Sequence, residues 1–282
     1  MKLLRYGPKG QERPGLLDQD GQIRTLSGHI ADIDGEVLSS GLDALAALDP
    51  ASLPLASNQS ARIAEPVRGV GKFLCIGLNY SDHAAEAGMP IPEEPILFTK
   101  ATSAIIGPND DVLLPPPSVK SDWEVELGIV IGKEARYVPL EQALDHVAGL
   151  CVVNDLSERE YQLERAGQWD KGKGCDTFGP FGPYLVTLDE IEDFNNLGMW
   201  LDVNGVRMQE GNTSTMIFDV PFLVHYVSQF MSLQPGDIIS TGTPPGVGMG
   251  MTPPVFLKEG DVMELGIDGL GTQRQMVKVF AG

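Results

Sequence analysis

The chain has 282 residues, a length that allows one large domain or a large domain with a smaller one. Hydrophobic residues make up 42% of it and charged residues 21%, which is the composition of a globular protein with a buried core. The formal net charge of −19 repels nucleic-acid phosphates and anionic lipids. Composition and charge therefore exclude nucleic acid and membranes as expected partners.

Cysteine use and the first residues predict the compartment. Cys75, Cys151 and Cys175 are too few and too scattered for a disulfide framework, and no C-x-x-C pair indicates a zinc site. The first residues, MKLLRYGPKG, lack the apolar segment of a signal peptide. No apolar run approaches the roughly 18 residues that a spanning helix needs. We expect a cytoplasmic protein.

The first 65 residues alternate short apolar groups with turn residues, which predicts a small β-containing domain. Asp20-Gly21 lies between two apolar segments and is a hairpin signal. A short helix is expected from about Gly41 until Pro50 stops it. A polar connection follows, so we place the boundary between a small N-terminal domain, 1–65, and a main domain, 66–282.

The main domain contains apolar, β-branched runs of strand length, bounded by Gly, Pro, Asp or Asn. These runs are Phe73–Leu78, Ile96–Thr99, Val125–Ile131, Val147–Val153, Leu201–Val203, Ile238–Ser240 and Val262–Ile267. Helical patterns are fewer, chiefly Pro139–Leu144 and Val220–Met231. Strands and helices do not alternate regularly enough for a doubly wound sheet, so the pattern predicts a β-rich α+β fold with peripheral helices.

The strongest local signal is a pair of acids at the head of an apolar strand, in the segment DWEVELGIVI at 122–131. Because side chains alternate along a strand, Glu124 and Glu126 share one face, and Val125 and Leu127 lie on the other. Taken alone, the E-x-E pattern is also typical of a solvated strand end.

A third acid, Asp155, follows the apolar run Val147–Val153. Taken alone it is typical of a helix N-cap or turn residue, with SEREYQLERA as the following helix. Three acids at strand ends repel one another unless a cation lies between them. An all-oxygen ligand set selects Mg²⁺, Mn²⁺ or Ca²⁺ over zinc.

His83 and Glu86 lie three residues apart in GLNYSDHAAEAG, which places them on one face of a helical turn. A carboxylate in that place orients the imidazole and raises its basicity, as in general-base catalysis. The alternative is a surface helix with a chance pair. His29, His146 and His225 are expected to be structural.

Two further segments supply cations that could hold an anionic substrate beside a metal. Arg159 and Gln162 lie one turn apart after Asp155, and Lys171 and Lys173 lie in the glycine-rich segment DKGKGCDTFGPFGP; each set alone is also typical of a surface. The segment TGTPPGVG at 241–248 resembles a phosphate-binding loop only loosely. Neither G-x-S-x-G nor H-E-x-x-H occurs, so serine-hydrolase and zinc-protease interpretations lack a motif.

Six blocks together resemble the fumarylacetoacetate hydrolase family, in that family's order, over about 70–265. They are GLNYSDHAAE, FTKATSA, DWEVELGIVIGK, NDLSEREYQ, KGCDTFGP and TGTPPGVG. The resemblance implies a mixed β-roll, an active-site Mg²⁺ or Mn²⁺ held by carboxylates, with Ca²⁺ as a conceivable non-native occupant, and a homodimer or a dimer of dimers. The first 65 residues resemble the small N-terminal module of some bacterial members.

Matched by motif, the resemblance also implies roles for individual residues. The metal ligands are Glu124, Glu126 and Asp155, the catalytic residues are His83, Glu86 and Lys173, and the substrate-binding residues are Tyr80, Lys100, Arg159, Gln162 and Thr243. The animal enzyme has a further acidic ligand two residues before its tyrosine, where this chain has Leu78. That difference favours the three-carboxylate arrangement of the smaller bacterial enzymes.

The activity implied by the resemblance is metal-dependent hydrolysis of the C3–C4 bond of a 2,4-diketo acid, giving pyruvate and a carboxylic acid. The blocks look most like the branch that acts on 2,4-diketo-3-deoxy sugar acids from fuconate or rhamnonate, with lactate as the second product. Acylpyruvate hydrolase, ureidoglycolate lyase, oxaloacetate decarboxylase and keto-acid isomerase are the alternatives. A metal-stabilised binding protein is the non-enzymatic alternative.

Overall fold

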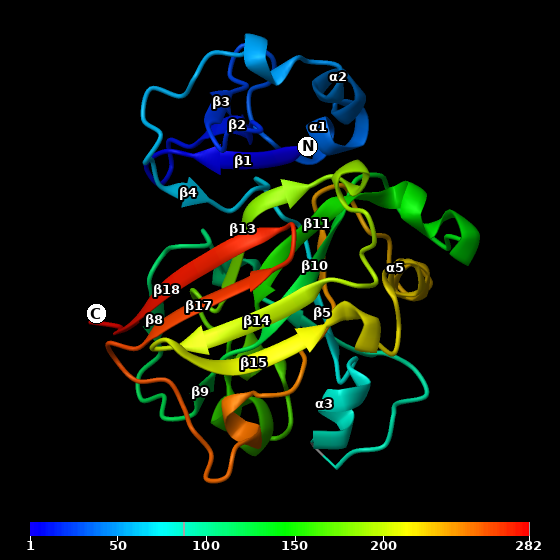
Figure 1. The fold of residues 1–282 in the computed structure, drawn as a ribbon. Helices are drawn as coiled ribbons and strands as arrows, with labels where there is room; N and C mark the ends of the chain where they lie inside the picture. Colours follow the sequence, from blue (N-terminus) through cyan, green and yellow to red (C-terminus); the bar gives the residue numbers. More distant parts are fainter. Residues whose placement is uncertain (87, 282) are drawn as a thin grey trace.

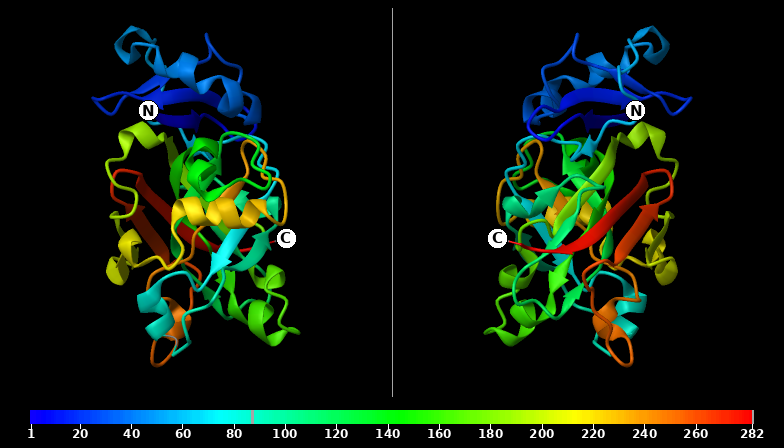
Figure 2. Two further views of the ribbon diagram at one scale, coloured as in Figure 1. Left: turned by 90° about the vertical axis from the view of Figure 1, so that its right-hand side faces the viewer. Right: turned by 90° about the vertical axis from the view of Figure 1, so that its left-hand side faces the viewer.

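The computed structural model describes residues 1–86 and 88–281. Strands dominate the ribbon in Figure 1, and the side views in Figure 2 show the first strands stacked at one end of the main body. Parallel and antiparallel strand pairs occur in the same sheet, for example β16 with β5 and β10 with β11. The expected β-rich α+β fold with mixed sheets is confirmed.

In the described part of the chain the strands form sheets of eleven, five and two strands. The eleven-stranded sheet contains β1 (Lys2–Tyr6), β2 (Arg13–Leu17), β3 (Ile23–Thr25), β4 (Ile63–Ala64), β5 (Phe73–Gly77), β6 (Ile96–Lys100), β7 (Ile105–Ile106), β10 (Val125–Ile131), β11 (Val147–Asn154), β13 (Gly179–Val186) and β16 (Ile238–Ser240). The five-stranded sheet contains β8 (Val112–Leu114), β14 (Gly198–Val203), β15 (Val206–Asn212), β17 (Val262–Ile267) and β18 (Gly271–Val279). The short strands β9 (Ser121–Asp122) and β12 (Ser157–Glu158) pair with each other.

Helices are short and lie around the sheets. The α-helices are α1 (Gly35–Ser40), α2 (Leu42–Ala46), α3 (Ser81–Glu86), α4 (Asp170–Lys173) and α5 (Val220–Ser228). Single 3₁₀ segments span Pro50–Ser52, Thr102–Ala104, Leu140–His146, Leu188–Glu190, Thr213–Thr215 and Gly248–Gly250, and Glu160–Glu164 forms a π-helical turn. Asp219 caps α5 by accepting a hydrogen bond from the backbone N–H of Phe222. The helix expected at 220–231 is present but already ends at Ser228. The helix expected at 139–144 is a 3₁₀ helix.

The N-terminal strands extend the main sheet. Strand β1 pairs with β2 on one side and with β13 on the other. The expected hairpin at Asp20-Gly21 connects β2 to β3, and Gly21 has the positive φ of +74° that such a turn favours in glycine. The division into 1–65 and 66–282 stays a prediction.

Strand β10 lies between β11 and β16 and separates two parts of the core. Val125 and Leu127 point into one hydrophobic cluster, and Val130 points into the other. The alternation expected from the sequence is confirmed, and it leaves Glu124 and Glu126 at the start of a strand that is otherwise wholly apolar. Two carboxylates are thereby carried into the interior of the protein.

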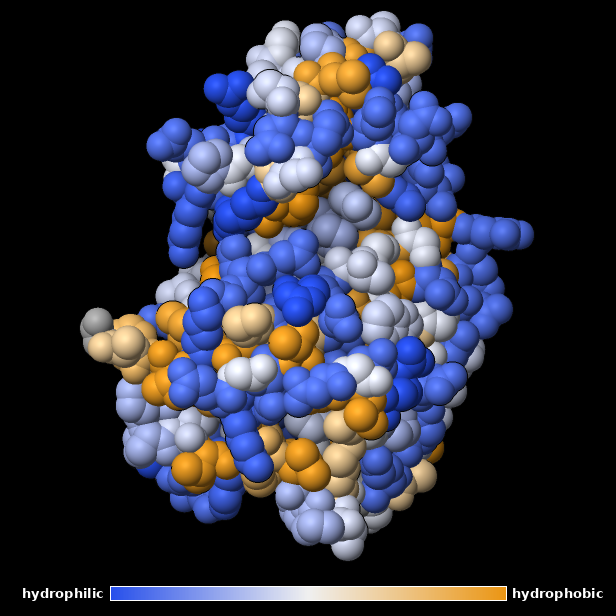
Figure 3. Space-filling view, turned by 60° about the vertical axis from the view of Figure 1, so that its left-hand side comes forward, coloured by the Kyte–Doolittle hydropathy of each residue, from blue (hydrophilic) through white to orange (hydrophobic). Residues whose placement is uncertain are grey.

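The surface agrees with the charge of the sequence. Hydrophilic side chains cover most of the face shown in Figure 3, with apolar side chains scattered between them. Among the described residues there is no helix with the length and apolar character needed to cross a bilayer.

Candidate active site

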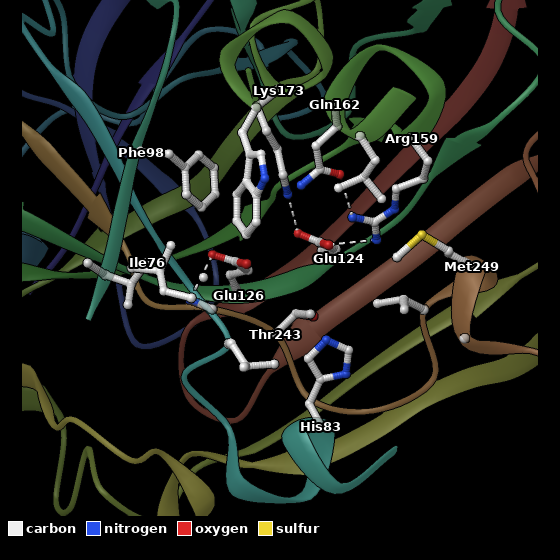
Figure 4. A pocket seen from close by; sticks show the side chains of 18 of the residues that line it. Ile76, His83, Phe98, Glu124, Glu126, Arg159, Gln162, Lys173, Thr243 and Met249 are labelled. Atoms are coloured by element: carbon white, nitrogen blue, oxygen red, sulfur yellow. Dashed lines mark hydrogen bonds and ion pairs between the residues drawn. The ribbon is translucent and has the colours of Figure 1, made fainter. Parts of the chain in front are cut away.

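A cavity of about 550 Å³ opens beside the start of β10. Figure 4 shows its polar end, where Glu124 and Glu126 rise from the strand, Lys173 reaches toward them, and His83 faces them from α3. Cavities of this size are typical of small-molecule sites.

Three carboxylates meet here: Glu124 and Glu126 line the cavity, and Asp155 lies next to them without lining it. Glu124, Glu126 and Asp155 are buried, and each offers one oxygen within 4.8 Å of the others. Asp155 is brought to Glu124 by the β10–β11 pairing, which continues in a hydrogen bond of 2.9 Å from the Asp155 backbone N–H to the Glu124 carbonyl. The structure thus places side by side the three acids that the sequence pattern singled out.

Two lysines compensate part of this charge. Lys173 Nζ lies 2.6 Å from Glu124 Oε2 and 2.8 Å from Asp155 Oδ2, and Lys100 Nζ lies 2.6 Å from Asp155 Oδ1. Burial alone would raise the pKa of Glu124, but the Lys173 ammonium and the Arg159 guanidinium outweigh burial and lower that pKa to about 2. Glu124 is therefore an anion that can bind a cation.

Glu126 is different because its described partners are neutral. It accepts hydrogen bonds from the Ser240 hydroxyl and from the Gly242 backbone N–H. Burial, and then the charges of Asp155 and Glu124, raise the pKa of Glu126 well above its usual value. A divalent cation among three carboxylate oxygens would supply the missing positive charge, and this hard oxygen set fits Mg²⁺ or Mn²⁺.

Arg159 is bound by Glu124 and by a further acid, Asp122. Its Nε donates to Asp122 Oδ2 at 2.8 Å, its Nη2 donates to Glu124 Oε1 at 2.7 Å, and its Nη1 donates to Gln162 Oε1 at 3.1 Å. Arg159 and Gln162 both line the cavity, as expected, but the guanidinium is already paired twice with carboxylates.

His83 and Glu86 form the expected pair on α3. His83 Nδ1 lies 3.0 Å from Glu86 Oε2, and Glu86 Oε1 accepts a hydrogen bond of 3.1 Å from the Gly246 backbone N–H. Both side chains line the cavity. The carboxylate fixes the imidazole, and Nε2, which has no hydrogen-bond partner in the described part of the chain, can bind a substrate or a water molecule.

The loop 241–249 holds carboxylates with its backbone amides. Gly242 donates to Glu126, Gly246 to Glu86, and Gly248 to Asp122 at 2.7 Å. The loose resemblance of this segment to a phosphate-binding loop has a physical basis, since its N–H groups do bind anionic oxygens, but these oxygens belong to the protein. One loop thereby positions three acids: Glu86 from α3, Asp122 from β9 and Glu126 from β10.

Several expected contacts differ in the structure. Tyr80 is fully buried, its hydroxyl lies 3.3 Å from Met199 Sδ, and it is not among the residues that line the cavity, so its substrate contact stays a prediction. Lys100 is likewise not among the residues that line the cavity, and it is bound to Asp155. Thr243 lines the cavity as expected. Lys171 is exposed and lies away from the carboxylates, bonded to the Arg165 carbonyl.

The interpretation of Asp155 as a helix cap is wrong. Its carboxylate accepts from Lys100 and Lys173, and the chain after it forms β12 before the π-helical turn begins. A pair of lysines binds a buried carboxylate more strongly than backbone amides at an exposed helix end would.

Sequence reasoning gave no role to Asp122, Phe98 or Trp169. Asp122 anchors Arg159, and the two aromatic side chains line the cavity. Asp122 is the first residue of the D-W-E-V-E pattern, and this position beside Glu124 and Glu126 was the sequence signal that could have indicated its role in the site. Nothing in the local pattern around Trp169 indicates the cavity, because its neighbours across the cavity come from distant strands.

Known proteins resemble the chain over its full length. The family model described as fumarylacetoacetate (FAA) hydrolase C-terminal matches residues 72–278. A Burkholderia multivorans protein that is provisionally named a hydrolase is 62% identical over 280 residues, 99% of each chain. The fumarylacetoacetate hydrolase of psychrophilic Exiguobacterium antarcticum superposes with a TM-score of 0.87 at 36% identity, covering 99% of this chain and 100% of that one.

A second solved structure carries ligands. Maleylpyruvate hydrolase from Sphingobium sp. SYK-6, in complex with manganese(II) and pyruvate, superposes with a TM-score of 0.82 at 30% identity and 99% coverage of both chains. The family model covers most of the main domain, and the solved structures share both the fold and the length of this chain. The protein is accordingly an enzyme of the fumarylacetoacetate hydrolase family.

Proposed function

We propose that the protein hydrolyses the C3–C4 bond of a 2,4-diketo acid and releases pyruvate and a carboxylic acid. The observation that carries this proposal is that Glu124, Glu126, Lys173 and the His83–Glu86 pair line one cavity, and that the buried Asp155 lies against Glu124, Glu126 and Lys173. The related maleylpyruvate hydrolase, which was solved with manganese(II) and pyruvate, supports this chemistry.

We assign Glu124, Glu126 and Asp155 to the binding of Mg²⁺ or Mn²⁺. Such a cation would supply Lewis-acid polarisation of the 2-oxo group of the substrate. Each carboxylate oxygen that accepts from a lysine still has a free lone pair, so the observed hydrogen bonds do not prevent the three acids from binding a metal.

The side chains around these acids have two further roles, proton transfer and stabilisation of negative charge. His83, fixed by Glu86, takes a proton from water as the water oxygen bonds to C4. The C3–C4 bond breaks, its electron pair moves to C3 as the enolate of pyruvate, and protonation of C3 completes the reaction. Negative charge grows on the C2 oxygen, and the Lys173 ammonium stabilises that charge more than it stabilises the ground state.

Pyruvate release from acetylpyruvate tests this function. We expect activity that EDTA abolishes and that Mg²⁺ or Mn²⁺ restores, and a loss of roughly 10²–10⁴-fold in kcat for His83→Ala. His29→Ala, a change at an exposed histidine, is the matched control and should keep full activity. Wild-type protein that releases no pyruvate from any 2,4-diketo acid in the presence of either metal would refute the proposal.

The same assay separates the alternatives. Product formation from ureidoglycolate or oxaloacetate without diketo-acid hydrolysis would favour the lyase or the decarboxylase. EDTA that lowers Tm in a protein inactive on every substrate would favour a structural metal. We also propose a homodimer, as the family resemblance implies, which sedimentation equilibrium can test.

A further inference from the structure

The cavity is lined by apolar groups as well as by carboxylates. Five large apolar side chains line it, and we name them together the apolar wall: Ile96, Phe98, Leu163, Trp169 and Met249. In Figure 4 Phe98 lies on one side of the acids and Met249 on the other. A substrate that binds the acids therefore has apolar groups on both sides of it.

Trp169 and Phe98 are fixed in place before any substrate arrives. Their rings pack edge to face with centroids 5.2 Å apart. The Trp169 indole lies over Gly77, where an added Cβ would be 2.8 Å from ring atom Cζ3. Lys173 Nζ lies 5.1 Å from the centre of the Phe98 ring. The aromatic pair thus borders directly on the group that stabilises the reacting end of the substrate.

The cations around the cavity are already paired. Arg159 and Lys173 are the only Arg or Lys residues among the described residues that line it. Arg159 binds Asp122 and Glu124, and Lys173 binds Glu124 and Asp155. A second carboxylate on the substrate would enter a cavity lined by acids without gaining an ion pair.

The rim of the cavity leaves apolar groups in water. Leu163 is 43% exposed, Met249 is 39% exposed, and Met89 beside them is 51% exposed. Exposed apolar groups gathered at a cavity are typical of a binding site for an apolar ligand. Methionine side chains adapt their shape to different partners, so the rim can fit tails of more than one form.

We propose that the preferred substrate is a 2,4-diketo monocarboxylate whose acyl group is apolar, an alkyl or aryl chain that lies against the apolar wall. This inference rests on the proposed function and names its substrate class. Water adds to C4, the C3–C4 bond breaks, and the products are pyruvate and an apolar carboxylic acid. The hydroxyl groups of a sugar acid would lose hydrogen bonds to water against these side chains.

A substrate series with the wild-type enzyme and Mn²⁺ tests this inference. We expect kcat/KM to rise by about 4-fold for each methylene that the wall buries, hence about 15-fold from acetylpyruvate to butanoylpyruvate. Maleylpyruvate and a 2,4-diketo-3-deoxy sugar acid should both react less efficiently than butanoylpyruvate. Either of them reacting more efficiently than butanoylpyruvate would overturn the inference and leave the hydrolase function intact. No pyruvate from any of the four would instead defeat the proposed function.

Two variants link the preference to the wall. Leu163→Arg adds an unpaired cation, so the ratio of kcat/KM for maleylpyruvate to that for butanoylpyruvate should rise by at least about 10-fold. Met249→Gln should reduce the ratio for butanoylpyruvate over acetylpyruvate. The control is Val206→Ser, because Val206 is exposed but lies outside the cavity. Ratios in both wall variants equal to those of the control would overturn the inference.

Discussion

Gly172 allows helix α4 to pack closely against the segment from Glu158 to Gln162, because glycine has no side chain. The next residue, Lys173, binds the carboxylates of the site. A Cβ at position 172 would lie 2.3 Å from the Glu158 carbonyl oxygen and 2.6 Å from the Gln162 backbone nitrogen. Ordinary contact begins at 3.4 Å, so Gly172→Ala requires the two segments to separate by about 1.1 Å. Both obstacles are backbone atoms, which cannot rotate away.

That separation is large on the scale of the site. If Lys173 moves with α4, its 2.6 Å hydrogen bond to Glu124 lengthens to about 3.7 Å, beyond the usual hydrogen-bond limit of about 3.2 Å. A displacement of about 1 Å in a catalytic group can cost roughly 10²-fold in rate, or about 2.7 kcal/mol. Overpacking should also lower stability by about 1–3 kcal/mol.

We would measure kcat/KM for pyruvate release together with the urea-unfolding free energy of Gly172→Ala. Gly28→Ala is the control, because Gly28 has no atom within 4 Å of an added Cβ and no positive φ. A Gly172→Ala enzyme that matches the control in rate and stability would refute the argument that this glycine positions Lys173.

Three other changes test separate parts of the structure. Glu86→Gln should lower kcat in the pyruvate assay by about 10- to 100-fold, because His83 loses the carboxylate that fixes its orientation. Arg5→Met should reduce the urea-unfolding free energy by about 3–5 kcal/mol, because the buried Asp32 and the partly buried Glu65 lose their counter-charge. Burial raises the pKa of Asp110, but the Arg62 guanidinium outweighs burial and lowers it. Ionised Asp110 therefore stabilises the fold above its ordinary pKa of 3.8, and this contribution is lost as the pH falls through the lowered pKa. Asp110→Asn should flatten the fall of Tm below about pH 4.

Each of these predictions has an outcome that contradicts it. Wild-type kcat in Glu86→Gln would mean that His83 is oriented by other groups. An Arg5→Met protein as stable as the wild type would show that the ion pairs of Arg5 contribute little. A Tm profile of Asp110→Asn parallel to that of the wild type from pH 6 to pH 2 would remove Asp110 from the acid response.

The sequence predicted the acids of the site better than their surroundings. Strand β10 was readable because Val125 to Ile131 is apolar apart from Glu126, and its period of two placed Glu124 and Glu126 on a common face. Strand β13 was missed because Gly179, Gly182 and two prolines interrupt any apolar pattern. Its partners, not its own residues, make it a strand.

Long-range pairing also decided the placement of single residues. Lys100 and Tyr80 belong to segments that match the family's sequence blocks, yet neither lines the cavity. Lys100 is bound to Asp155, and Tyr80 packs on Met199. The spacing of residues along the sequence does not reveal whether a side chain lines a cavity or packs outside it. Trp169 was missed for the same reason, since Gly77 and Phe98, which hold it, come from β5 and β6.

The central claim is that the three acids bind one divalent cation, and calorimetric titration of Mn²⁺ into EDTA-treated protein tests it most directly. We expect one ion per chain, and an affinity at least about 100-fold weaker in Glu126→Gln, because Glu126 has no cationic partner among the described residues. Glu134→Gln, at an exposed acid, should bind like the wild type. Equal affinity of the wild type and Glu126→Gln would contradict the account.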